Sequence, residues 1–111
     1  MINSLMNLEN LTKDVPDVEN LLKEVPEVEN MTSSNGNTVP NQFIISGNGW
    51  RLFQSYSSPI ALIMRGKVYI FPDWRYSRTT GKYRNMFLGE TQAETLKNLE
   101  TGKYIPVGFE V

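Results

Sequence analysis

Residues 65–84 combine the two kinds of side chain that proteins use to hold nucleic acid. The segment contains six of the eleven Lys and Arg residues of the chain and a single acidic residue, Asp73. Cations bind phosphates, and aromatic rings stack on unpaired bases. Trp, Tyr and Arg are also enriched at the centres of protein interfaces. The pattern predicts a surface that contacts nucleic acid or a protein partner, formed by Arg65, Lys67, Tyr69, Trp74, Arg75, Tyr76, Arg78, Lys82, Tyr83 and Arg84.

A structural role for the same aromatic residues is an open alternative. Phe71, Trp74 and Tyr76 belong to a region of about 70 residues, and aromatic side chains dominate cores of that size. The arginines would then lie on a solvated loop. The two interpretations differ in whether the rings are exposed.

The composition argues against catalysis. The chain contains no cysteine and no histidine, which removes the usual thiolate nucleophile, the commonest general base near neutral pH and the commonest zinc ligands. Gly81-Lys82 is not a phosphate-binding loop, because Tyr83 stands where Ser or Thr would hold magnesium. Asp73 has no second carboxylate before Glu90. We therefore expect a protein that is not an enzyme and that needs no metal or cofactor.

The near-neutral net charge of −1 conceals a division along the chain. Residues 1–40 hold seven acidic and two basic residues, and residues 41–111 hold five acidic and nine basic ones. Such asymmetry is typical of an interaction arm beside a binding domain.

The sequence contains no apolar run long enough to cross a membrane and no secretion signal, so we expect a cytoplasmic protein without a membrane partner.

The acidic arm contains a ten-residue repeat. Residues 19–28 nearly copy residues 9–18, and a third copy starts at Glu29. Apolar spacing within each copy predicts short amphipathic helices over residues 4–14 and 16–25, with breaks between helices at Pro16 and Pro26. Helices this short are marginal in water, so the arm (residues 1–31) either docks as helices or stays disordered.

A linker over residues 32–41 precedes a β-rich domain over residues 42–111. Hairpin signals at Asn48-Gly49 and Arg65-Gly66 separate runs that alternate between two faces. Thr91 and Glu94 predict the start of one C-terminal helix, which Gly102 ends. Residues 72–84 are expected to be irregular, residues 86–88 to form a short strand, and residues 104–111 to add an edge strand. The predicted fold class is α+β: an antiparallel meander of three to five strands with one helix.

A domain of this size buries a modest fraction of its surface, so association into a homo-oligomer would add stability.

The motif W-x-Y-S-x-T-T-x-K-Y-x-N-x-F-L-G-E over residues 74–90 resembles a small uncharacterised domain of phage and plasmid proteins. The resemblance covers about residues 43–105 and implies a mobile-element accessory protein acting in the host cell. It carries no assigned activity and no functional residues.

Two functional hypotheses follow. The first is a mobile-element protein that binds nucleic acid, or a host nucleoprotein complex, through the 65–84 surface, with anti-defence inhibition of a CRISPR-like system as one such role. The second is a protein–protein adaptor or inhibitor acting through the acidic arm, which can mimic nucleic acid in a basic groove. A virion or assembly role is a further alternative.

Overall fold

The computed structural model describes residues 17–111, so the helix expected over residues 4–14 lies outside the described part. Six strands form one sheet in which neighbours in sequence are neighbours in space. The strands are β1 (Glu27–Thr32), β2 (Thr38–Gly47), β3 (Trp50–Ser55), β4 (Ser58–Met64), β5 (Lys67–Ile70) and β6 (Ile105–Pro106), and the helices are α2 (Val18–Leu22), α3 (Arg78–Leu88) and α4 (Gln92–Glu100).

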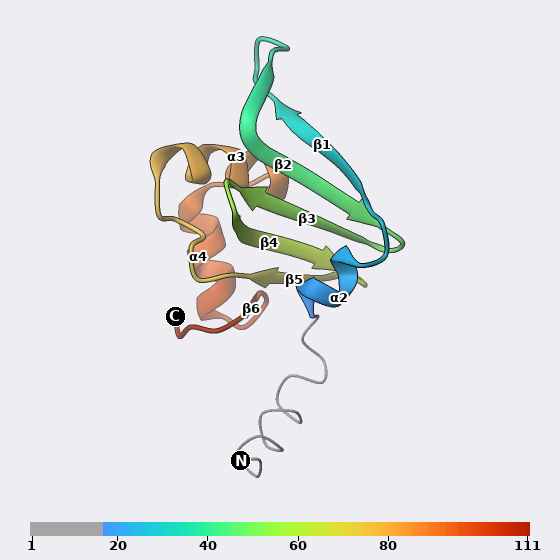
Figure 1. The fold of residues 1–111 in the computed structure, drawn as a ribbon. Coiled ribbons are helices and arrows are strands. Elements are labelled where there is room, and N and C mark those ends of the chain that lie inside the picture. Colours follow the sequence, from blue (N-terminus) through green and yellow to red (C-terminus); the bar gives the residue numbers. More distant parts are fainter. Residues whose placement is uncertain (1–16) are drawn as a thin grey trace.

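The first five strands form an antiparallel meander, and β6 pairs in parallel with β5 (Figure 1). This confirms the α+β class and the expected hairpins. Gly49 and Gly66 adopt the positive φ angles of 82° and 76° that tight two-residue turns require. The sheet has six strands rather than three to five, because residues 27–32, which were expected to lie outside the domain, add β1. The expected C-terminal edge strand is present as the two residues of β6.

Strands β3, β4 and β5 are buried on both faces of the sheet. Phe53, Ala61 and Ile70 lie on the face that α3 and α4 cover, where Phe87 and Leu99 pack against them. Leu52 and Leu62 lie on the other face, against which Val18 and Leu21 of α2 pack. The alternation of side chains along β3 and β5 therefore follows the expected two faces. A register shift between Phe53 and Gln54 leaves Ile60 as the extra residue of β4.

Helix α3 corrects the expectation for residues 72–88, which were assigned to an irregular stretch followed by a strand. The side chain of Ser77 caps the first turn by accepting a hydrogen bond from the Thr80 backbone, and Gly89 ends the helix in the left-handed conformation. The pattern Ser-x-x-Thr with glycine twelve residues after the serine was the local signal for it. Helix α4 begins with the expected capping box of Thr91 and Glu94. There are thus two helices on this face, not one.

The arm and linker also differ from expectation. Strand β1 begins within the segment assigned to the arm and ends at Thr32, the first residue of the expected linker, and residues 38–41 of that linker belong to β2. The helix expected over residues 16–25 is confined to Val18–Leu22. The reason is pairing: residues 27–32 lie against β2, where Met31 is buried in the core, so they gain more from the sheet than from a short helix.

Candidate nucleic-acid interface

The ten candidate contact residues separate into three groups. Tyr69, Trp74, Tyr83 and Arg84 are buried. The alternative interpretation therefore holds for Trp74 but not for Arg84, because that interpretation placed the arginines on a solvated loop. Arg65 and Lys67 are exposed where β4 turns into β5. Figure 1 places that turn at the end of the sheet away from α3. The expectation of one continuous surface over residues 65–84 is therefore wrong, because a strand carries the chain from one end of the sheet to the other.

Four candidates remain exposed and lie at the end of the sheet where α3 begins. They are Arg75, Tyr76, Arg78 and Lys82. Tyr76 is 51% exposed, which leaves its ring open for stacking. Arg78 and Lys82 are four residues apart in α3 and so share one side of the helix.

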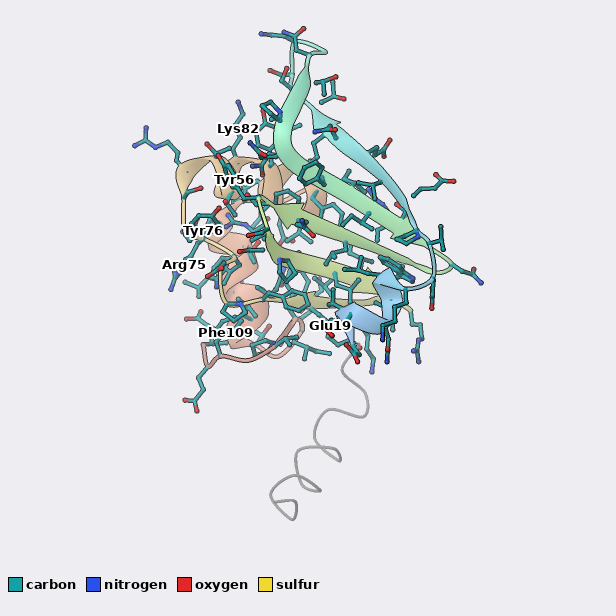
Figure 2. All side chains as sticks on the ribbon, viewed as in Figure 1. Glu19, Tyr56, Arg75, Tyr76, Lys82 and Phe109 are labelled. Carbon is teal, nitrogen blue, oxygen red and sulfur yellow. The ribbon has the colours of Figure 1, made fainter. Side chains whose placement is uncertain are left out.

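A fifth residue, Tyr56, belongs to the same end of the molecule and was missed from sequence. It was expected within β3, but it lies in the two-residue turn between β3 and β4, 47% exposed. Its φ angle of 55° is in the left-handed region, which is unfavourable for an aromatic residue. Such strain at an exposed ring is a signal of function that only the backbone reveals. We call Tyr56, Arg75, Tyr76, Arg78 and Lys82 the α3-end surface; Figure 2 labels four of them.

Two side-chain hydrogen bonds hold the Tyr56 turn against the start of α3. The hydroxyls of Ser55 and Thr80 lie 2.8 Å apart and are buried. On the other side of the turn, the Ser58 hydroxyl donates to the Asp73 carboxylate at 3.0 Å. Residues on both sides of Tyr56 are thus tied to the segment that carries Arg75 and Tyr76, and Asp73 is the acidic residue at the rim of the α3-end surface.

The beginning of α3 adds positive potential to this surface. The first turn of α3 contains no acidic residue. The N-terminal end of a helix carries a partial positive charge from its unpaired backbone N–H groups. Three cations and this helix end therefore favour an anion at the α3-end surface.

Arg84 is fully buried, and its hydrogen bonds hold the segment that carries the α3-end surface. One guanidinium nitrogen donates to the Trp74 carbonyl oxygen, and another donates to the side-chain oxygens of Asn85 and Gln92 at 2.8 and 3.3 Å. Burial lowers the pKa of Arg84, and the charge of Glu90 offsets part of that effect. The Nε atom has no partner among the described residues. Arg84 therefore links the Trp74 loop to both helices and cannot itself reach a ligand.

Glu90 organises the junction between α3 and α4. Its carboxylate accepts hydrogen bonds from the hydroxyls of Thr95 and Tyr104, both at 2.6 Å. Desolvation, together with the bond to Glu90, raises the pKa of Tyr104 to about 12. The network closes the C-terminal tail onto the helices and leaves these groups paired inside the fold.

Within residues 17–111, no group of three or more acidic side chains could hold a metal ion. In the same range, no helix has the length and apolar character needed to cross a membrane.

A protein-family model covers residues 26–103, which is most of the chain. The chain belongs to the DUF8033 family, a family of unknown function. No curated protein and no solved structure matches it. The DUF8033 match begins just before β1, in agreement with the position of that strand in the sheet. It includes the whole α3-end surface and excludes α2.

Proposed function

We propose that the protein binds single-stranded nucleic acid, alone or within a nucleoprotein complex, through the α3-end surface. The observation that carries the proposal is the presence of two exposed tyrosines, Tyr56 and Tyr76, beside Arg75, Arg78 and Lys82 at the start of α3. Cations follow a phosphate backbone, and exposed rings stack on bases that are not already paired. Unpaired strands are favoured over duplex because duplex bases offer no free face to these rings.

The resemblance to phage and plasmid proteins extends this proposal to a biological setting. Binding of a guide or target strand would let a mobile-element protein interfere with a CRISPR-like defence complex in the host cytoplasm. No catalysis, cofactor or metal enters this mechanism: the protein acts by occupying nucleic acid or the groove that holds it.

The proposal is tested with fluorescence anisotropy, using labelled single-stranded DNA, single-stranded RNA and duplex DNA at two salt concentrations. We expect single strands to bind more tightly than duplex. Each phosphate contact should contribute about 0.7 to the slope of log K against log salt. Absence of binding to all three probes at low salt would exclude direct contact with nucleic acid.

A matched pair of variants locates the site. Arg78→Ala/Lys82→Ala removes two cations from the α3-end surface, and Arg65→Ala/Lys67→Ala removes two exposed cations from the opposite end of the sheet. We expect only the first variant to weaken binding, with a salt slope lower by about 1.4 for two lost contacts. Equal weakening in both variants would indicate binding by overall charge and would reject the α3-end surface.

A second candidate function is a protein adaptor or inhibitor acting through acidic residues near the N-terminus. The exposed acidic residues are the N-cap of α2 and residues on α2, on β1 and on the segment that joins them: Asp17, Glu19, Glu24, Glu27 and Glu29. Deleting residues 1–31 is a poor test, because it removes β1 and the buried Met31. Replacing Glu27 and Glu29 with Gln keeps the strand. Loss of inhibition with unchanged nucleic-acid binding would favour this function.

A further inference from the structure

The two described copies of the repeat adopt different secondary structures. Residues 17–22 read Asp-Val-Glu-Asn-Leu-Leu and contain α2, whereas residues 27–32 read Glu-Val-Glu-Asn-Met-Thr and form β1. Three of the six positions are identical, one exchanges one acid for another, and one exchanges Leu for Met. The sixth position is Leu22 in the helical copy and Thr32 in the extended copy, and it is the position where intrinsic preference favours the observed conformations.

The two side chains of β1 that contact the rest of the fold most closely have counterparts in the earlier copy. Met31 is the only buried side chain of β1, and it packs into the core on the α3 side. Asn30 donates a hydrogen bond to the Val39 carbonyl oxygen at 2.9 Å. A shift of ten residues would bring Leu21 to the Met31 position and Asn20 to the Asn30 position, with the same alternation of faces.

Weak contacts hold α2, and the segment between α2 and β1, in the observed structure. Helix α2 has five residues, none of them buried. Val25, between α2 and β1, is 90% exposed and has a φ angle of 56°, which is strained for a β-branched residue. A hollow of about 540 Å³ lies between residues 24–27 and residues 46–48. The side-chain bond from Trp50 Nε1 to Glu24 Oε1 is 3.3 Å long.

We propose that the edge of β2 that β1 covers is a binding site for this hexapeptide, and that residues 17–22 occupy it in a second state of the same chain. Residues 23–37 then form the connection that residues 33–37 form in the first state. Loop-closure entropy makes the longer connection only about fivefold less probable, because the cost grows with the logarithm of length. The exchange moves Glu27 and Glu29 from the sheet into this connection, together with Glu24 from the segment before β1.

The first test is disulfide trapping, for which the chain is suited because it contains no cysteine. Glu27 faces Ser46 in the observed register, and the shift by ten puts Asp17 there instead. In the observed state Asp17 does not face Ser46. The β4 residue aligned with Ser46 across β3 is Ile63, whereas Asp17 lines a hollow with Pro59, which is four residues away from Ile63 along β4. Facing residues on antiparallel strands have the Cα separation that a disulfide needs.

Three double variants are compared under mild oxidation: Asp17→Cys/Ser46→Cys for the shifted register, Glu27→Cys/Ser46→Cys for the observed one, and Asn20→Cys/Ser46→Cys as an out-of-register control. We expect the shifted pair to form an intrachain disulfide at least tenfold faster than the control. Equal rates for these two pairs, or disulfides only between chains, would overturn the proposal.

The second test does not touch the helix cap. Leu21 and Met31 pack in separate cores on opposite faces of the sheet, so without exchange their substitutions act independently. If the exchange occurs, Met31→Asp shifts the population of the chain toward the state in which residues 17–22 occupy the edge of β2. Leu21→Asp should then change the unfolding equilibrium constant at least tenfold more in the Met31→Asp background than in the native chain. The same change in both backgrounds, or an unfolded Met31→Asp single variant, would contradict the exchange.

Discussion

The guanidinium of Arg84 lies 5.0 Å from the ring centre of Trp74 and donates a hydrogen bond to the carbonyl oxygen of the same residue. Arg75 lies 4.8 Å from the same ring centre. One buried indole is thus in contact with an interior cation and an exposed one. These contacts join the loop that carries Arg75 and Tyr76 to the interior of the fold, which is the support that the proposed binding surface needs.

Substitution of Arg84 should show that its geometry matters more than its charge. Arg84→Ala leaves a cavity and removes the partner of the Trp74 carbonyl, so we expect the free energy of unfolding to fall by about 3 kcal/mol. Arg84→Met keeps most of the volume and removes the cost of burying a charge, so its loss should be smaller. Urea denaturation followed by tryptophan fluorescence measures both. An Arg84→Ala protein as stable as the native one would contradict this role.

Stability should depend on pH through Tyr104. Its pKa is raised in the folded protein from 10.0 to about 12, so the folded state favours the protonated phenol. The stabilisation is complete below pH 10 and is lost as the pH rises from 10 towards 12. Because other groups also titrate there, the measurement is the difference in unfolding free energy between the native protein and Tyr104→Phe. That difference should shrink across this interval, and a constant difference would show that the phenol is not linked to folding.

We expect Tyr56 to lower the stability of the fold and to strengthen the binding of single-stranded nucleic acid. Its left-handed backbone suits glycine, so Tyr56→Gly should leave the free energy of unfolding unchanged or raise it by up to about 1 kcal/mol. The same variant should bind single-stranded nucleic acid about 5- to 100-fold more weakly if the ring stacks on a base. Tyr56→Phe is the control, because it keeps the ring. Native-like affinity of Tyr56→Gly would remove Tyr56 from the interface.

The buried side chain of Gln42 is a second feature that lowers the free energy of unfolding. Its side chain is fully buried, faces Ser55 across the β2–β3 pair, and has no hydrogen-bond partner on either amide atom within residues 17–111. Gln42→Leu should raise the free energy of unfolding by about 1–3 kcal/mol, because an unpaired polar group no longer has to be desolvated. Gln54→Leu is the contrast: Gln54 donates to the Tyr56 carbonyl oxygen at 2.9 Å, so its replacement should destabilise the turn. Calorimetry of the two variants checks the opposite signs.

Local chemistry predicted much of the architecture. The turns at Asn48-Gly49 and Arg65-Gly66, the two faces of β3 and β5, and the capping box at Thr91 all depend on residues close together in sequence. These features could be predicted because turn and cap preferences involve only neighbouring residues. The prediction for α3 was wrong although its signals at Ser77 and Gly89 are equally local, because the basic and aromatic residues of this segment are also typical of an irregular binding loop.

Other features were decided by contacts between distant residues. Nothing near Arg84 in sequence distinguishes it from Arg78, yet one is buried against Trp74 and the other is exposed. Tyr56 joins Tyr76 only because hydrogen bonds tie its turn to residues 73 and 80. The clearest case is the repeat, in which Val-Glu-Asn is helical at residues 18–20 and extended at residues 28–30. Neither form is stable as an isolated segment, so the partner each copy finds, a sheet face or the edge of β2, determines its structure.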